Sequence, residues 1–152
     1  MQPKHITIHC SATQPLRSID VNVIRKMHLK RGFNDIGYHF VITTDGEVQP
    51  GRSLALTGAH VKGHNTDNVG ICLIGGIDVT GKAVDNFTDL QWDALRYLIT
   101  ELAGNYGILE TNIKGHRDWF PDINGDGVID RQDWLKECPC FDVADKLREW
   151  GE

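Results

Sequence analysis

Two short stretches of the chain carry side chains that could hold a metal ion. The first is His9, in the sequence His9-Cys-Ser-Ala-Thr13, and the second runs from His116 to Cys138. Two imidazoles and a thiolate are the protein ligands of a zinc site that keeps its fourth position open for water. A zinc ion held in this way activates the water and polarises a scissile carbonyl. If the three side chains converge, the residues predict a metal-assisted hydrolase.

Each candidate ligand also has a simpler interpretation. A single histidine is more often a core or surface residue than a ligand, and a single cysteine is usually buried and inert. We expect this of Cys10, which should point away from His9 in an alternating strand, and of Cys72, which lies in an apolar run. His60 and His64 lie between glycines, which suggests a loop, and they rank below His9 as ligands. Spacing alone therefore leaves the zinc site undecided.

Length, composition and charge narrow the class of protein. The chain has 152 residues, 40% of them hydrophobic and 24% charged, which is typical of a soluble globular protein with one domain. A net charge of −5 argues against a nucleic-acid partner. The N-terminus has no long apolar run, so we expect no signal peptide, no membrane insertion and synthesis in the cytoplasm. We also expect a monomer.

Alternating apolar residues predict the strands. Residues 5–9 alternate, with the two isoleucines on one face and the histidines on the other. Residues 38–43 form a second predicted strand, which Asp45-Gly46 turns into a hairpin with 47–49. The apolar run 70–76 is typical of a strand buried on both faces. A last predicted strand, 112–116, ends at His116.

Helical spacing and capping residues predict three helices. The first ends at Gly32 and is capped by Ser18 or Asp20. The second opens with the capping box Thr88-x-x-Gln91 and closes at Gly107, and Asp142 caps the third. Strands mixed with helices predict an α/β fold with a central mixed β-sheet flanked by helices.

Five motifs follow one another along the chain. They are His9-Cys-Ser-Ala-Thr13, Gly37-Tyr38-His39-Phe40, Gly58-Ala-His60-x-x-Gly63-x-Asn65, Val69-Gly-Ile-Cys-Leu-Ile-Gly-Gly76 and Lys136-x-Cys138-Pro139-x-Phe141-Asp142. In this order they resemble the zinc N-acetylmuramoyl-L-alanine amidases, which include phage endolysins and the peptidoglycan recognition proteins. The similarity is closest to the small phage amidases and covers nearly the whole chain apart from about 118–135. It implies the fold of that family and peptidoglycan as partner.

The resemblance also implies roles for individual residues. His9, His116 and Cys138 would hold zinc. Tyr38 would lie beside the attacking water or the developing oxyanion, and Lys136 would face the same oxyanion. Attack on an amide carbonyl builds negative charge, so a cation or phenol donor aimed at it lowers the barrier. Without the motif, Tyr38 would be a strand aromatic and Lys136 a solvated charge.

Two further roles rest on the same resemblance. His60 and Asn65 would line the groove as contacts to glycan or stem peptide. The family assigns zinc to the cysteine before proline, which is Cys138. In an extended segment Cys140 would share a face with Cys138, so it could replace Cys138 as ligand or oxidise with it.

An acidic loop departs from the family pattern. It has oxygen ligands at loop positions 1, 3, 5, 9 and 12 and glycine at position 6, which is EF-hand-type spacing close to that of dockerin loops. The predicted Ca²⁺ ligands are Asp122, Asn124, Asp126, the Val128 carbonyl, Asp130 and Asp133. Pro121 argues against an entering helix, and the alternative is a solvated acidic turn. We predict calcium binding that orders the segment carrying Lys136 and Cys138.

Together these observations predict an enzyme that lyses cell walls. It would hydrolyse the amide between N-acetylmuramic acid and L-alanine in peptidoglycan, as a phage or prophage endolysin that reaches the wall after release. A bacterial recycling enzyme also fits. The alternative is a recognition module that binds peptidoglycan without cleaving it. Loss of the zinc cysteine marks such modules, and this chain keeps Cys138.

Overall fold

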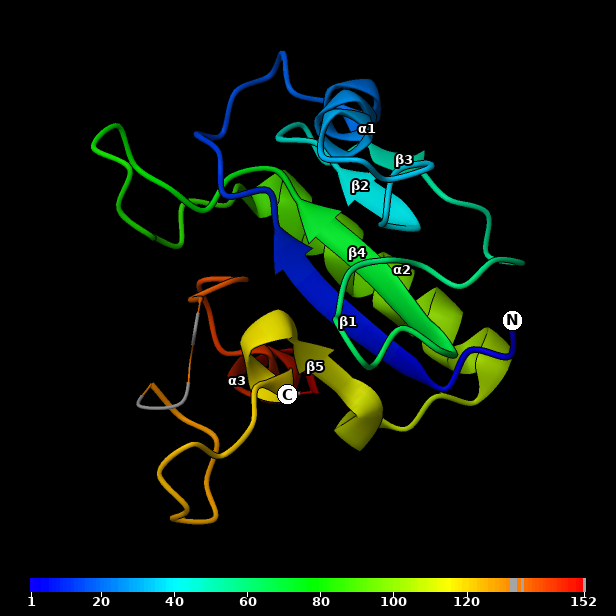
Figure 1. Cartoon of the computed structure of the whole chain (residues 1–152), viewed down its shortest axis with the longest axis vertical. Coiled ribbons are helices and arrows are strands. Elements are labelled where there is room, and N and C mark those ends of the chain that lie inside the picture. The colour runs from blue at the N-terminus through cyan, green and yellow to red at the C-terminus, as the bar shows by residue number, and fades with distance from the viewer. Residues whose placement is uncertain (132–133, 135, 152) are drawn as a thin grey trace.

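A five-stranded mixed sheet forms the centre of the protein (Figure 1). The computed structural model describes residues 1–131, 134 and 136–151. The strands are β1 (His5–Cys10), β2 (Phe40–Ile42), β3 (Val48–Pro50), β4 (Asn68–Leu73) and β5 (Ile113–Gly115), in the spatial order β3-β2-β4-β1-β5. β1 runs parallel to both of its neighbours, β4 and β5, and β3 is an antiparallel edge strand paired with β2.

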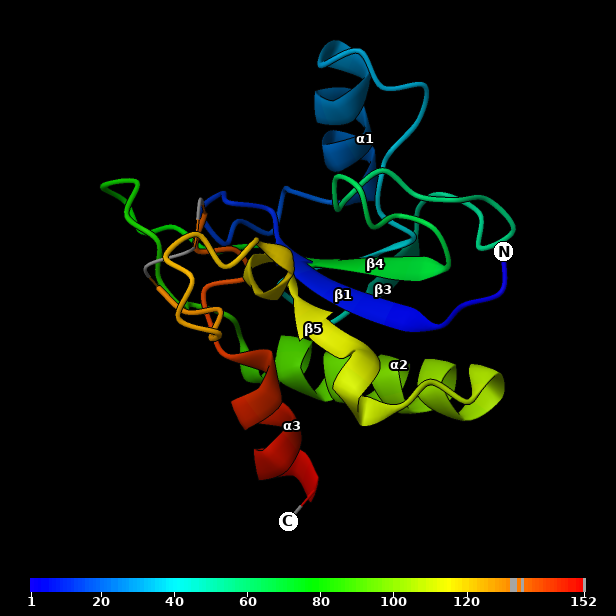
Figure 2. The same ribbon diagram turned by 60° about the horizontal axis from the view of Figure 1, so that its bottom comes forward.

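Helices cover both faces of this sheet, which confirms the predicted α/β class. Figure 2 shows α1 (Val21–Lys30) on one face, with α2 (Asp89–Tyr106) and α3 (Val143–Gly151) on the other. Two 3-10 turns, η1 (Glu110–Asn112) and η2 (His116–Trp119), flank β5. None of the described helices combines the length and apolar character needed to cross a membrane.

The helix ends follow the predicted capping residues. Asp20 caps α1, because its side chain accepts a hydrogen bond from the Val23 N–H. Thr88 and Gln91 form the predicted capping box of α2, which ends at Gly107 in the left-handed conformation. The Asp142 carboxylate accepts from the Asp145 N–H at 2.9 Å, so it caps α3 as predicted.

The alternation of β1 separates the main core from the functional face. Ile6, Ile8 and Cys10 point into the larger core, which α2 and α3 complete. Full burial of an isoleucine of this kind contributes about 1.5–3 kcal/mol. His9 points to the opposite face, as predicted. On that face, Cys72 joins a smaller apolar cluster under α1.

Every strand prediction differed from the structure in its limits, by one residue for β1 and for β3. β5 spans Ile113–Gly115 and not 112–116, because His116 begins η2. β4 begins at Asn68 and ends at Leu73, whereas the apolar run predicted residues 70–76. Gly75 and Gly76 have φ values of 135° and 102°, which a strand does not allow, so the chain leaves the sheet before them. β2 is shorter than predicted and begins at Phe40.

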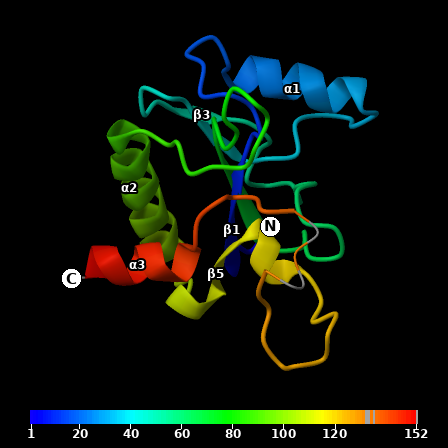
Figure 3. The same cartoon turned by 90° about the vertical axis from the view of Figure 1, so that its left-hand side faces the viewer.

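The acidic segment forms a loop outside the central layers. Figures 1 and 3 show that the chain after η2 extends away from the sheet before it returns towards α3. The aromatic ring of Phe141 anchors the returning chain in the core, with its centroid 4.7 Å from that of Trp92. The residues between η2 and Phe141 are therefore held at both ends.

Candidate metal centre and active site

The carboxyl ends of two parallel strands place His9 and His116 side by side. Ile8 of β1 pairs with Gly115, the last residue of β5, so the residue that follows each of them in the chain is one of the two histidines. Their ring centroids lie 4.7 Å apart. The carboxyl ends of parallel strands are where open α/β sheets generally bind ligands. Local sequence order and strand register thus account for the meeting of two residues that are far apart in the chain.

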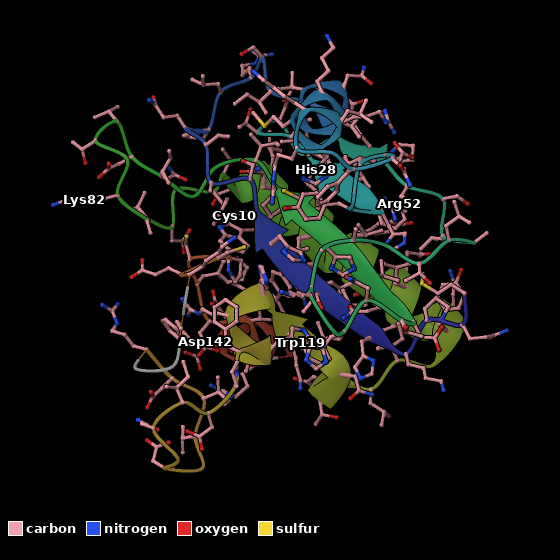
Figure 4. The ribbon with its side chains drawn as sticks, in the orientation of Figure 1. Cys10, His28, Arg52, Lys82, Trp119 and Asp142 are labelled. Atoms are coloured by element: carbon pink, nitrogen blue, oxygen red, sulfur yellow. The ribbon has the colours of Figure 1, made fainter. Side chains whose placement is uncertain are left out.

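η2, which begins with His116, is docked on β1 by a partly buried hydrogen bond. The indole Nε1–H of Trp119 donates to Thr7 Oγ1 at 2.9 Å, and Thr7 belongs to the same strand face as His9. Figure 4 shows Trp119 beside β1. This contact holds the turn in which His116 lies against the strand that carries His9.

Cys138 reaches the same place through contacts of its segment. The Cys10 N–H donates to Cys138 Sγ at 3.2 Å, and the Arg117 N–H donates to the Cys138 carbonyl at 3.0 Å. Pro139 packs directly on Gly115, where an added Cβ would come within 2.8 Å of the proline ring. The strand ends that carry the histidines therefore also position the cysteine.

The three side chains fit a zinc ion. Their ligand atoms lie within 4.8 Å of one another, and His9 Nδ1 is 3.9 Å from Cys138 Sγ. Tetrahedral zinc with bonds of about 2.0–2.3 Å would bring such atoms to about 3.3–3.8 Å, so small shifts suffice. Among the described residues, no other group of three histidine, cysteine or acidic side chains has this spacing.

Burial keeps both imidazoles neutral. Burial, with the neighbouring histidines, holds the pKa of His9 well below its ordinary value. The pKa of His116 falls to about 4, first through burial and then through the positive charge of Lys136. Neutral imidazoles carry the lone pair that a metal needs. No proton has to be displaced from either histidine at pH 7.

Cys140 is turned away from the candidate ligands. Residues 138–140 form a turn, and Cys140 has a φ of 73°, so the extended arrangement assumed from sequence is wrong. Cys140 Sγ lies 3.8 Å from Cys10 Sγ, and its thiol donates to the Gly76 carbonyl. All four cysteines are free. Only Cys138 joins the two histidines.

Tyr38 and Lys136 also lie at this site. The Tyr38 ring centroid is 4.9 Å from that of His9, and burial raises the pKa of the phenol well above its ordinary value. Tyr38 is therefore a neutral hydrogen-bond donor. Lys136 is exposed, and its charge acts on His116. The structure thus brings a phenol and an ammonium group to the two imidazoles.

A groove of about 570 Å³ opens over these residues. The residues predicted from sequence that line it are Tyr38, His60, Asn65, His116 and Lys136. His60 does more than line the groove, because its Nδ1 lies 2.9 Å from His9 Nε2. The Asn65 side chain accepts hydrogen bonds from the His60 and Val61 N–H groups, so it also fixes the backbone of its own loop. Contact of His60 and Asn65 with substrate stays a prediction.

Sequence reasoning missed several residues of this region. Arg31 and Lys62 line the groove and add positive charge to it, and Phe33 and Phe120 add aromatic surface. In Figure 4, His28 lies at the foot of α1, towards the sheet, and it borders the same groove. Nothing in the local sequence distinguishes these lysine and arginine residues from solvated surface charges.

Arg117 is the other residue that sequence reasoning missed. It is only 9% exposed although it is charged. Its guanidinium lies 3.8 Å from the ring centroid of Trp134, and its Nη1 donates to the Glu137 carbonyl at 3.3 Å. Arg117 therefore holds the chain just before Cys138. Its position directly after His116 was the available signal.

The acidic loop is shaped by hydrogen bonds between its side chains and its backbone. Asp122 accepts from the N–H groups of Gly125 and Gly127, and Asp126 accepts from that of Val128. Asn124 likewise accepts from the Asp126 N–H. The twelfth predicted ligand position, Asp133, lies outside the described residues. Calcium binding by this loop stays a prediction.

Comparison with known proteins connects this arrangement to a family. A family model described as N-acetylmuramoyl-L-alanine amidase matches residues 1–139. The endolysin of Klebsiella phage KP32 is 39% identical over 151 residues, which cover 99% of this chain and 87% of that protein. The endolysin of Escherichia phage T7 is 38% identical over 148 residues, which cover 97% of this chain and 84% of that protein.

Solved structures show the same fold. The N-acetylmuramoyl-L-alanine amidase LysC from Clostridium intestinale has a TM-score of 0.72 and 26% identity, and the match covers 97% of this chain and 86% of LysC. PGRP-LB from Drosophila has a TM-score of 0.71 and 26% identity, with 99% of this chain and 82% of PGRP-LB covered. The mixed sheet and its flanking helices are thus shared with both structures.

Proposed function

Because the chain belongs to the N-acetylmuramoyl-L-alanine amidase family, we propose that it is a zinc-dependent peptidoglycan hydrolase. The bond cleaved is the amide between N-acetylmuramic acid and L-alanine of the stem peptide. The observation that carries the zinc dependence is the convergence of His9, His116 and Cys138 within 4.8 Å. The family itself supports amidase activity on peptidoglycan.

The surrounding residues suit hydrolysis of an amide. When bound, zinc supplies a Lewis acid and lowers the pKa of water, so that a nucleophile is available near neutral pH. Lys136 and the neutral phenol of Tyr38 donate to the oxygen on which negative charge develops. The groove of about 570 Å³ holds the substrate, and Arg31 and Lys62 offer cations to its carboxylates.

In its biological role the protein is an endolysin that acts on the cell wall after release. The support for this role is the similarity along nearly the full chain to phage endolysins. The second candidate function is binding of peptidoglycan without cleavage. Its support is the shared fold with a peptidoglycan recognition protein such as PGRP-LB. A single incubation experiment distinguishes cleavage from binding alone.

The test is incubation of purified peptidoglycan with zinc-loaded protein. The enzyme should release new N-terminal alanine, whereas a binding module would only sediment with the polymer. The Cys138→Ser variant should lose zinc and turnover. The matched Cys140→Ser variant should keep both, because Cys140 faces Cys10. Co-sedimentation without free alanine would overturn the hydrolase, and full activity of Cys138→Ser would overturn its ligand role.

A further inference from the structure

A line of hydrogen bonds leads from a backbone carbonyl to the candidate metal ligand His9. His60 Nε2 lies 2.9 Å from the Asn68 carbonyl oxygen, and His60 Nδ1 lies 2.9 Å from His9 Nε2. The other nitrogen of His9, Nδ1, is the one that lies near Cys138 Sγ. Each ring nitrogen of His60 therefore has one partner, and the line ends at the metal centre.

The Asn68 carbonyl determines which ring nitrogen carries the hydrogen in both His60 and His9. A carbonyl oxygen only accepts hydrogen bonds, so His60 Nε2 must carry the hydrogen. In a neutral His60 the Nδ1 atom then bears a lone pair and accepts from His9 Nε2–H. A neutral His9 protonated at Nε2 has its lone pair on Nδ1, which faces Cys138. If His60 Nδ1 carried a hydrogen, His9 would have to carry its own on Nδ1 and could not bind a metal there.

The protein provides close-fitting space for the His60 ring. A Cβ added at Gly70 of β4 would lie 2.7 Å from His60 Cγ, and one added at Gly58 would lie 2.8 Å from His60 Cδ2. The ring can lie this close to the backbone only because both positions are glycine. From the other side, Asn65 holds the His60 backbone N–H at 2.9 Å.

We propose that His60 is a positioning residue that fixes the tautomer of His9 and directs its Nδ1 lone pair to the metal. Partners of this kind orient metal-bound histidines and raise their basicity. The inference rests on the proposed zinc site. This role of His60 does not require contact with substrate. It also explains why the Asn65 side chain is hydrogen-bonded to the His60 backbone.

A first test uses the unmodified metal-free protein. Long-range ¹H–¹⁵N correlation spectra distinguish a ring nitrogen that bears a hydrogen from one that bears a lone pair. The expected result is a hydrogen on Nε2 and a lone pair on Nδ1 for both His9 and His60. A His9 ring protonated at Nδ1 would overturn the proposal without any need for a variant.

A second test measures zinc affinity by competition with a chromophoric chelator. His60→Phe keeps a ring of similar shape but leaves His9 Nε2–H without an acceptor, so zinc should bind about 10- to 100-fold more weakly. His60→Asn retains a carbonyl acceptor near the Nδ1 position and should recover part of the loss. The matched control is His64→Phe, since His64 is an exposed histidine of the same loop that contacts Trp119.

The outcomes separate this inference from the proposed function. Failure of the unmodified protein to bind zinc would overturn the zinc site itself. Tight zinc binding by the unmodified protein and equally tight binding by a folded His60→Phe would overturn only the role of His60. A weakened His60→Phe beside an unchanged His64→Phe supports it. If His60→Phe does not fold, the tautomers seen in the unmodified protein decide.

Discussion

At the scale of single residues, the site places neutral imidazoles beside a positively charged side chain, and burial or exposure accounts for the difference. Burial holds His9 and His116 neutral, while Lys136 stays exposed and charged beside them. The Cys10 thiol has a pKa raised to about 12, first by its hydrogen bond with Cys138. Cys10 therefore stays a thiol near the candidate metal ligands and does not compete with them as a thiolate.

Substitution of Lys136 by methionine should slow catalysis without removing the metal. Loss of one donor to a developing oxyanion lowers kcat by about 10²–10³. Zinc affinity at pH 7 should change little, because the pKa of His116 is about 4 and has room to rise. The measurements are steady-state turnover of peptidoglycan fragments and zinc content.

The matched control for this substitution is Lys82→Met. Lys82 is exposed and lies on a loop far from the strand ends that carry the histidines (Figure 4). It should keep full turnover. A kcat for Lys136→Met equal to that of the unmodified protein would exclude Lys136 from oxyanion stabilisation.

At the scale of elements, the site depends on the contact between β5 and the segment that carries Cys138. Gly115 ends β5 and Pro139 packs on it, while Arg117 of η2 holds the backbone of Glu137 and Cys138. The end of β5 therefore positions His116 directly, and it positions Cys138 through the contacts of Gly115 and Arg117 with the Cys138 segment. A change at this contact acts on two ligands together.

Gly115→Ala should disturb the metal centre from within β5. The new Cβ would lie 2.8 Å from Pro139 Cδ, so the Cys138 segment must move. We expect a loss of about 1–3 kcal/mol in the free energy of unfolding and weaker zinc binding. Gly104→Ala in α2 is the control, because no atom of a neighbouring element in the described part of the chain lies within 4 Å of its added Cβ.

The control should behave in the opposite way. Alanine is about 1 kcal/mol more favourable than glycine inside a helix, so Gly104→Ala should raise the urea midpoint and leave zinc affinity unchanged. Equal zinc affinity of Gly115→Ala and the unmodified protein would show that the contact with Pro139 does not position Cys138.

The acidic loop makes a separate prediction at this scale. Its oxygen-rich spacing should take up Ca²⁺, and uptake should raise the melting temperature of the zinc-loaded protein by ordering the chain before Cys138. Titration calorimetry measures the uptake. Asp122→Ala, which also removes the acceptor for two backbone N–H groups, should abolish it. If calcium gives no heat of binding with the unmodified protein, the loop is a solvated acidic turn that does not bind calcium.

At the scale of the whole molecule, burial lowers the pKa of most of the histidines. Six of its seven histidines have a pKa below the ordinary value, and burial is the largest cause for each. Those of His60 and His116 fall to about 4. The carboxyl of Asp118, which is half-buried, shifts the other way: burial raises its pKa above the ordinary value.

Metal-free protein should therefore lose stability in mild acid. Between about pH 6.5 and pH 4 the unfolded chain binds protons on histidines that the folded chain keeps neutral, so the free energy of unfolding falls as pH falls. The urea midpoint should be lower at pH 5 than at pH 7. His60→Asn should reduce this difference, because it removes a histidine whose pKa falls to about 4. A midpoint that is constant over this range would contradict the buried neutral state.

The sequence alone determined the features that depend on near neighbours. Alternation in residues 5–9 separated the core face of β1 from the face of His9, and Thr88 with Gln91 marked the start of α2. The ordered motifs predicted the zinc ligands and the residues expected to act on the substrate. These signals are local because strand alternation and capping involve residues within about four positions of each other.

Only the tertiary structure decided which distant groups meet. It turned Cys140 towards Cys10 and left Cys138 with the histidines, and it set His60 against His9. It also ended β4 at Leu73, where the following glycines turn out of the sheet. Contacts of this kind depend on strand register and on the space that glycines leave between layers. Neither is encoded in the spacing of the residues that finally touch.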